Sequence, residues 1–289
     1  MKVRIAKTSG FCFGVKRAFE IALREAKMTE SGNVFTDGPL IHNPQALERL
    51  QNQGIKILEE IKRNIKGTII IRSHGVSPER RKELEKTGAK IVDATCPKVK
   101  IVQSVISQYA QKGFYVVIIG DKSHAEVRGL LGHANEKGIA IQTEYDLKKL
   151  PSSAKLCVVA QTTQNKDKFT LLSEKIKERF PEALIFDTIC ETNRNRQEEL
   201  KDLCNLVDAI IVVGGKESAN TRRLVEIAKL EGKPTFFVES ENELVPDKLK
   251  DFKEVGIIGG ASTPDWVLSR VVSKLEKLEN HHDWKIEAG

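Results

Sequence analysis

The stretch KIVDATCPKVK, residues 90–100, joins an apolar run, a cysteine and the start of a helical pattern. The same order recurs around two further cysteines, in IFDTICETNR (185–194) and in VRIAKTSGFCFGVKR (3–17). Cys12, Cys96 and Cys190 thus occupy matching turns between a predicted strand and a predicted helix. Recurrence of one local pattern along a chain indicates internal repeats, and repeats can decide the architecture. The sequence therefore predicts three copies of one αβ domain.

Two polar loops follow each of these cysteines, and each loop comes after an apolar run. The first set lies 28 to 30 residues after the cysteine, in IHNP with His42, SHAEV with His124 and ESANT with Ser218. The second set is RSHGV with His74, AQTTQ with Thr162 and GGASTP with Ser262. The strand that would complete the third domain is missing after residue 264, so we expect residues 2–8 to supply it. The predicted domains are 12–95, 96–189 and 190–289, the last completed by residues 1–11.

The apolar runs are short and β-branched, as in TIIIRS, YVVIIG, KLCVVA and AIIVVGG. They alternate with amphipathic runs that are predicted to be helical, such as 78–87 and 219–230. Nearly continuous apolar strands separated by helices are typical of parallel sheets covered on both faces. Ligands of such sheets bind beyond the carboxyl ends of the strands, where all of these loops lie. We predict an α/β fold of three pseudo-equivalent domains, with mainly parallel sheets around one shared site.

Length and composition narrow the class of protein. A chain of 289 residues has room for two or three small domains. The net charge of +7 fits a solvated Lys/Glu-rich surface or attraction of an anionic substrate, and no basic cluster with interleaved aromatic residues indicates a nucleic-acid face. Neither a membrane span nor a signal peptide is predicted, so we expect a cytoplasmic protein without a membrane partner.

The five cysteines do not suggest disulfides, because their number is odd and their spacing wide. Cys157 and Cys204 lie inside apolar or helical runs and are expected to be buried apolar side chains. Cys12, Cys96 and Cys190 lie where a helix N-terminus stabilises a thiolate. Three converging thiolates favour an iron–sulfur cluster with one open iron. Zinc and a merely structural role remain alternatives, although the absence of C-x-x-C disfavours structural zinc.

The loops supply hydrogen-bond donors and few bulky side chains. Their imidazoles, hydroxyls and amide suit a phosphate or diphosphate, and the nearby glycines allow close approach of the backbone. Glu126 follows His124 at the predicted start of a helix. A first-turn glutamate is common there because the helix dipole favours it. Beside a metal cluster and a phosphate pocket, Glu126 is also the natural general acid.

Taken together, these segments resemble the 4-hydroxy-3-methylbut-2-enyl diphosphate reductase family of the methylerythritol phosphate route to isoprenoids. The ordered set is GFCFGVKRA, IHNP, SHGV, DATCP, SHAEVRG, QTT, DTIC, SANT and GASTP, and it spans nearly the whole chain. The resemblance implies that the three domains surround a central 4Fe–4S cluster. It assigns Cys12, Cys96 and Cys190 as cluster ligands and Glu126 as proton donor. It assigns the substrate pocket to His42, His74, His124, Thr162, Ser218, Ala219, Asn220 and Ser262.

Two positions within this pattern need comment. Ala219 stands where many members of the family have a second serine, so a hydroxyl contact is lost while a backbone contact can remain. QTT offers two adjacent threonines, of which Thr162 is preferred over Thr163.

The resemblance also implies the reaction. The expected activity is reductive dehydroxylation of (E)-4-hydroxy-3-methylbut-2-enyl diphosphate to isopentenyl and dimethylallyl diphosphate plus water. Two single electrons pass through the cluster, whose open iron binds the substrate hydroxyl and is labile enough to leave a 3Fe–4S form. The expected partners are this small allylic diphosphate and a one-electron donor such as ferredoxin or flavodoxin.

Two other classes of protein share part of this pattern. A non-redox dehydratase would use a three-cysteine cluster only as a Lewis acid, and it would turn over without a reductant. An iron or redox sensor would need neither Glu126 nor the phosphate donors, so the presence of both disfavours a sensor.

Overall fold

The computed structural model describes residues 1–29, 33–152 and 154–279. Proximity of Cα atoms divides the chain into two compact units. Unit 1 comprises residues 1–15, 41–49 and those from 191 onward, and unit 2 comprises residues 16–40 and 50–190. The predicted domain boundaries at residues 12, 96 and 190 stay a prediction, and residues 280–289 of the third domain lie outside the described part.

The described residues form three four-stranded parallel sheets. The first contains β2 (Val34–Thr36), β3 (Ile55–Ile57), β4 (Thr68–Ile71) and β5 (Lys90–Asp93). The second contains β6 (Tyr115–Ile119), β7 (Gly138–Ile141), β8 (Leu156–Ala160) and β9 (Leu184–Phe186). The third contains β1 (Lys2–Ile5), β10 (Ala209–Val213), β11 (Thr235–Val238) and β12 (Glu254–Gly259).

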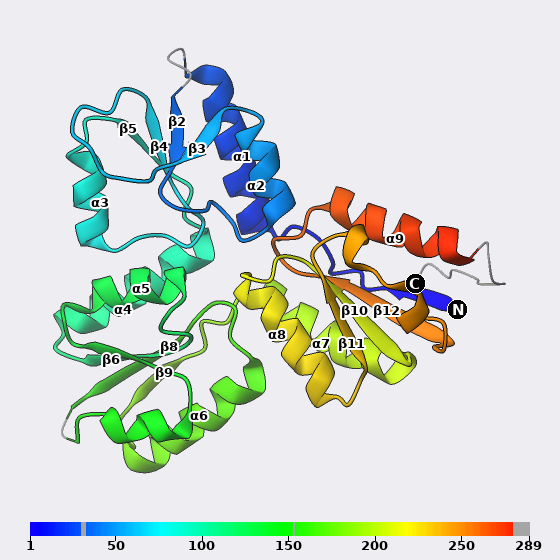
Figure 1. Cartoon of the computed structure of the whole chain (residues 1–289). Coiled ribbons are helices and arrows are strands. Elements are labelled where there is room, and N and C mark those ends of the chain that lie inside the picture. Colours follow the sequence, from blue (N-terminus) through cyan, green and yellow to red (C-terminus); the bar gives the residue numbers. More distant parts are fainter. Residues whose placement is uncertain (30–32, 153, 280–289) are drawn as a thin grey trace. The chain divides into compact units, whose positions relative to one another are not determined.

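The α-helices alternate with these strands (Figure 1). They are α1 (Phe13–Met28), α2 (Pro44–Gln51), α3 (Pro78–Glu85), α4 (Pro97–Gln111), α5 (Ala125–Leu131), α6 (Lys166–Arg179), α7 (Glu191–Leu206), α8 (Ala219–Leu230) and α9 (Asp265–Glu279). Short 3-10 helices occupy Gly132–Ala134, Glu144–Lys149, Glu241–Glu243 and Pro246–Lys248. No described helix is both long enough and apolar enough to span a membrane.

All three sheets have the same strand order. Taken from the edge strand that precedes each cysteine, the orders are β5-β4-β2-β3, β9-β8-β6-β7 and β1-β12-β10-β11. In the third sheet the edge strand comes from the N-terminus, because β1 pairs with β12 through Val3 opposite Val255. The predicted α/β class with three pseudo-equivalent parts is therefore confirmed.

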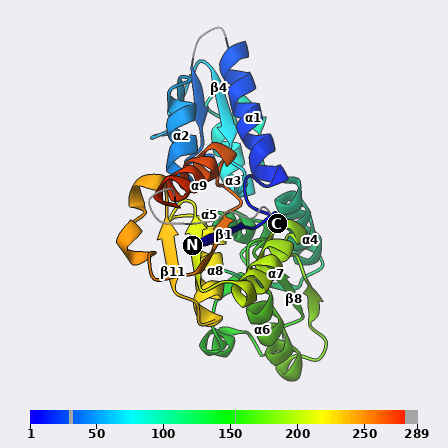
Figure 2. The same cartoon turned by 90° about the vertical axis from the view of Figure 1, so that its right-hand side faces the viewer.

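The central strand β10 of the third sheet is apolar on both faces, which explains why its sequence, AIIVV, contains only Ala, Ile and Val. Ile211 and Val213 of β10 pack with α9 through Val267 and Val271. On the other face Ile210 and Val212 pack with α7 and α8. Figure 2 shows β1 with α9 on one side and α7 on the other. Burial on both faces is the property that separates a parallel sheet from a half-exposed antiparallel one.

The second sheet is built in the same way. Val117 and Val158 pack against α6, where Phe169, Leu172 and Ile176 are buried. On the opposite face, strand residues pack with Val99, Val102 and Ile106 of α4 and with Val127 and Leu130 of α5. These helices fix the turns that precede them, and those turns carry the candidate site residues.

Candidate functional site

Each of the three singled-out cysteines immediately precedes a helix. Cys12 precedes α1, Cys96 is the residue before Pro97 of α4, and Cys190 precedes Glu191 of α7. All three are half-buried and lie outside any disulfide. Since a helix N-terminus favours negative charge, these positions suit thiolates that bind a metal.

The backbone of each cysteine is tethered to a second loop of its own sheet. The amide of Cys96 donates to the carbonyl oxygen of Ser73 at 2.9 Å, and the amide of Cys190 donates to that of Thr162 at 2.9 Å. The amide of Cys12 donates to the carbonyl oxygen of Ala261 at 3.0 Å. Ser73 precedes His74 and Ala261 precedes Ser262 in the chain, and Thr162 is itself a candidate substrate residue. Each cysteine is therefore held beside one candidate substrate loop.

The two remaining cysteines have a different environment. Cys157 in β8 and Cys204 in α7 are buried. Burial raises the pKa of the Cys157 thiol to about 12 and that of Cys204 to about 11, because the charged form loses its hydration. Neither thiol forms a thiolate readily at neutral pH, so the prediction that both are apolar side chains agrees with their surroundings.

Residues of α7 that were not singled out from the sequence hold the segment before Cys12. The guanidinium of Arg196 is only 1% exposed and donates through Nη2 to the carbonyl oxygens of Thr8 and Gly10. Glu199 accepts from the amides of Lys7 and Thr8 at 2.6 and 2.8 Å. Arg196 and Glu199 thus bind carbonyl oxygens and amides, respectively, of the segment before Cys12. A sequence signal existed: Arg196 lies at the helical spacing of the buried residues Asn193 and Leu200.

The candidate substrate residues follow the two strands at which each sheet order reverses. In the first sheet these strands are β2 and β4, in the second β6 and β8, and in the third β10 and β12. The loops beyond them contain His42, His74, His124, Thr162, Ser218 and Ser262. Open parallel sheets bind ligands at this point, because the two connecting helices diverge to opposite faces and leave a crevice.

Three of these loops meet within unit 1. The hydroxyl of Ser262 donates to the carbonyl oxygen of His42 at 3.0 Å and lies 3.3 Å from Oγ of Ser218. A Cβ placed on Gly215 would lie 2.4 Å from the same carbonyl oxygen, so only glycine allows this approach. Ser218 caps α8, accepting from the amide of Thr221 at 3.3 Å.

Asn220, in the first turn of α8, is 3% exposed. Among the described residues, neither its amide nitrogen nor its amide oxygen has a hydrogen-bond partner. Buried polar groups are usually paired, so an orphaned amide indicates a missing ligand or water. Ala219, beside it, is half-buried and carries no hydroxyl, so only its backbone can contact a ligand.

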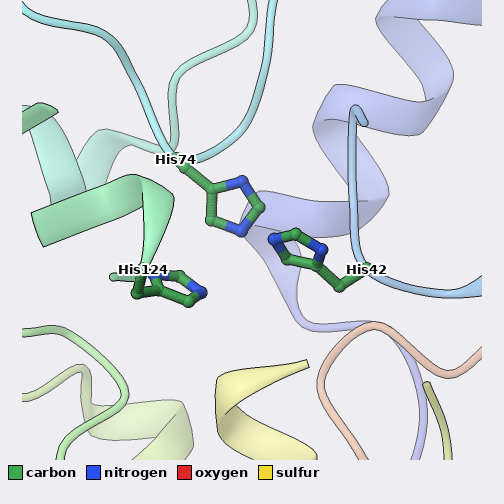
Figure 3. A group of neighbouring side chains, drawn as sticks. All are labelled: His42, His74 and His124. Carbon is green, nitrogen blue, oxygen red and sulfur yellow. The ribbon is translucent and has the colours of Figure 1, made fainter. Parts of the chain in front are cut away.

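The other candidate side chains meet within unit 2. The rings of His74 and His124 are edge to face, with centroids 5.2 Å apart (Figure 3). Nδ1 of His124 accepts from the amide of Glu126 at 3.2 Å. Oε1 of Glu126 accepts from the amide of Thr162 at 2.6 Å, and Oε2 accepts from its hydroxyl at 2.8 Å. His42, which Figure 3 also draws, belongs to unit 1.

The structure separates the two threonines of QTT. The hydroxyl of Thr162 is committed to Glu126, whereas Oγ1 of Thr163 is buried and lacks a partner within the described part of the chain. Thr163, which the sequence analysis ranked below Thr162, is thus a second candidate contact. Another acid near the loops, Glu217, has an 84% exposed side chain and pairs with Arg222 at 3.8 Å. Its exposure makes it a poor rival to Glu126.

Glu126 is 2% exposed. Burial raises the pKa of its carboxyl from 4.5 to about 7, and the two hydrogen bonds from Thr162 offset part of that effect. A carboxyl with this pKa carries a transferable proton at neutral pH, which is the property that a general acid requires. The arrangement can therefore donate a proton inside a water-poor site.

The same raised pKa makes folding stability depend on pH. Between about pH 4.5 and 7 the folded protein keeps a proton that the unfolded chain releases, so stability falls as pH rises. The loss is complete above pH 7 and amounts to roughly 3 kcal/mol. We expect Glu126→Gln to remove this pH dependence. Between pH 4.5 and 8, the free energy of unfolding of the variant, measured with denaturant, should therefore rise by that amount relative to that of the parent. The exposed Glu182→Gln should show no such gain, and identical pH profiles for Glu126→Gln and parent would contradict the assignment.

The donor set is compatible with an iron–sulfur cluster. Three accessible thiols lie at helix starts, while the two other cysteines are buried with raised pKa values. A cubane cluster is held by thiolates, and three leave one iron open. No disulfide links any of the five cysteines.

Comparison with known proteins shows the family of the chain. Residues 3–276 match the family described as LytB protein. A protein of Aquifex aeolicus named 4-hydroxy-3-methylbut-2-enyl diphosphate reductase is 43% identical over 279 residues, covering 95% of this chain and 96% of its own. A protein of Alkaliphilus oremlandii with the same name is 40% identical over 280 residues, covering 96% and 100%.

Two solved structures are also similar. One is (E)-4-hydroxy-3-methyl-but-2-enyl diphosphate reductase, described as the terminal enzyme of the non-mevalonate pathway, with 42% identity, a TM-score of 0.68 and coverage of 96% of this chain and 99% of that one. The other is E-1-hydroxy-2-methyl-but-2-enyl-4-diphosphate reductase of Plasmodium falciparum, with 27% identity, a TM-score of 0.92 and coverage of 100% and 92%. The chain therefore belongs to the LytB family, and like its named relatives it is an oxidoreductase.

Proposed function

We propose that this oxidoreductase reductively removes the hydroxyl of (E)-4-hydroxy-3-methylbut-2-enyl diphosphate, forming isopentenyl and dimethylallyl diphosphate plus water. The observation that carries the proposal is the buried Glu126 carboxyl, whose pKa is about 7, held by Thr162 beside His124. Loss of a hydroxyl as water needs a proton at that oxygen, and this carboxyl can supply one at neutral pH.

Cys12, Cys96 and Cys190 are proposed to hold a 4Fe–4S cluster. When bound, the cluster supplies two single electrons and a Lewis-acidic open iron for the substrate hydroxyl, and loss of that iron leaves a 3Fe–4S form. The half-buried thiols at helix starts support this assignment. Half-buried thiols outside any disulfide suit a reducing compartment, so we propose a cytoplasmic location. The proposed one-electron donor is ferredoxin or flavodoxin.

The chain itself binds the diphosphate and excludes water from the proton donor. The diphosphate is proposed to accept hydrogen bonds from His42, His74, His124, Ser218, Asn220 and Ser262 and from the backbone of Ala219, while Thr162 contacts the substrate hydroxyl. Uncharged donors at strand ends can satisfy phosphate oxygens. The unpaired amide nitrogen of Asn220 supports this role, because a phosphate oxygen would accept its hydrogen bond.

Thr162 can pass the proton onward. When Glu126 is ionised, its Oε2 accepts from the threonine hydroxyl at 2.8 Å. When Glu126 is protonated at Oε2, the same contact can reverse, and the threonine O–H is then free to donate to the substrate oxygen. The proton moves through one hydroxyl over this short distance, so the backbone does not have to shift. Throughout, the amide of Thr162 can keep its hydrogen bond to Oε1 of Glu126.

The test of the proposed function is anaerobic purification with iron and sulfide counts, followed by an assay on the hydroxybutenyl diphosphate. About four irons per chain and turnover that requires dithionite with a viologen mediator are expected. Turnover without reductant would favour a dehydratase instead. A loaded cluster with no turnover under either condition would favour a sensor.

Replacing Asn220 by alanine should weaken substrate binding with the cluster intact. A hydrogen bond to a charged group contributes about 1.5–3 kcal/mol, which corresponds to roughly a ten- to hundredfold change in affinity. Calorimetric titration of the loaded protein with substrate would measure the change. Asn205→Ala, an exposed position on α7, is the matched control. Equal affinities in both variants would remove this loop from the proposed site.

A further inference from the structure

Unit 2 contains a cavity of about 340 Å³ that none of the candidate site residues lines. Its walls come from the ends of β2 and β4 and from α3 and α5. The polar side chains in the lining are Asp37, Arg72, Ser77, Arg80 and Arg128. This volume lies within the range of sites for small molecules, at its lower end.

The charges in this cavity are unbalanced. Three guanidinium groups face one carboxylate. That carboxylate, on the buried Asp37, is already engaged by Arg80, whose Nη2 and Nε lie 2.7 and 3.2 Å from Oδ1. Among the residues that the structure describes, Arg72 and Arg128 have no carboxylate within 4.0 Å. An excess of guanidinium groups around a cavity favours an anion there.

Arg72 has an unsatisfied hydrogen-bond donor. Its Nε is buried and has no hydrogen-bond partner in the described chain. Burial lowers the pKa of its guanidinium, Asp37 opposes that change, and the positive charges of Arg128 and Arg80 lower the pKa further. Guanidinium stays charged at physiological pH, so a buried unpaired donor of this kind is costly unless an acceptor occupies the cavity.

Glycines bring the backbone close to these groups and to the facing wall. Gly38 has a φ of +76°, and a Cβ built on it would lie 2.8 Å from Nη1 of Arg72. A Cβ on Gly129 of α5 would lie 3.5 Å from the carbonyl oxygen of Gly75. Nε2 of His133 lies 3.4 Å from the carbonyl oxygen of Val76, which also joins these two walls. The walls are thus packed closely enough to hold their side chains in place.

We propose that this cavity is a second anion site, which binds a small phosphorylated molecule through Arg72 and Arg128, while Arg80 stays paired with Asp37 and Glu83 and adds only its positive charge. Arginine forks match the oxygens of a phosphoryl group in pairs, and two forks supply enough donors for one phosphoryl group. The site is separate from the residues assigned to substrate, yet it adjoins them in sequence. Gly75 follows His74, and Ala125 follows His124, so an occupant contacts the backbone that carries both imidazoles and can alter substrate affinity.

The experiment is calorimetric titration of the cluster-loaded protein with inorganic diphosphate, in low salt and without phosphate buffer. Two classes of binding are expected in the parent. Asn220→Ala should weaken one class, and Arg128→Gln should weaken the other by roughly ten- to a hundredfold. Arg128 is exposed, so its variant should fold normally. Arg72→Lys should also weaken the second class, because lysine keeps the charge but loses the planar fork.

Arg81→Gln is the matched control, since Arg81 lies on α3 but pairs with Glu85 and Asp93 outside the cavity. Its titration should equal that of the parent. A single class of binding that only Asn220→Ala weakens would overturn the proposal. So would equal binding by Arg128→Gln, Arg72→Lys and Arg81→Gln. The cavity assignment does not depend on turnover, so its failure would leave the proposed reaction untouched.

Discussion

Cys96→Ser is expected to lose its cluster and, with it, all reductive turnover. Serine oxygen is a harder and much less acidic ligand than thiolate sulfur, so one of only three anchors is removed. The half-buried Cys96 lies directly before α4 and is tethered to Ser73. Iron and sulfide content and the visible absorption of anaerobically purified protein should fall to background. Cys12→Ser and Cys190→Ser should behave alike, because the three positions are equivalent in the fold.

Cys157→Ala provides the matched control. Its thiol is buried in β8 with a pKa raised to about 12, and alanine leaves no unpaired hydroxyl in the core. The variant should retain full iron content and lose only some stability from the vacated volume. Loss of the cluster in Cys157→Ala, or full iron content in Cys96→Ser, would show that the ligands have been wrongly assigned.

Glu126→Gln is expected to lower reductive turnover by roughly 10²- to 10⁴-fold, the usual contribution of a positioned proton donor. Glutamine keeps the shape and can still accept from Thr162, but it has no transferable proton. Substrate affinity and the cluster spectrum should change little. Because the acid form is the active one, parent turnover should decline as pH rises through about 7, and this decline should be absent from the residual turnover of the variant.

Glu217→Gln serves as the control, because Glu217 lies near another loop but has an 84% exposed side chain. It should turn over like the parent. Normal turnover by Glu126→Gln would assign the proton to His124 or to the substrate diphosphate. Loss of the cluster or precipitation of Glu126→Gln would show that this residue supports the start of α5 rather than the reaction.

Much of the fold follows from local pattern. β-Branched runs of four to six residues, separated by amphipathic runs, predicted parallel strands. Strands β8 and β10 are buried along their whole length, and β6 is buried at all positions except Tyr115. The range 219–230 predicted for one helix is that of α8. The range 78–87 was two residues too long, since α3 ends at Glu85 and Lys86 is its cap. Helix ends depend on capping contacts that apolar periodicity does not report.

The sequence by itself determined the α/β class, the turns that carry Cys12, Cys96 and Cys190, and the position of Glu126 in a first helical turn. These properties depend on neighbours within a few residues, so composition and spacing report them. Only the tertiary structure decided that Glu126 is buried against Thr162 and that Arg196 holds the segment before Cys12. It also decided that Arg72 faces a cavity with more arginines than carboxylates in its lining. Those properties are set by contacts between residues far apart in the chain, which determine desolvation and hydrogen bonding and therefore the charge state of each group.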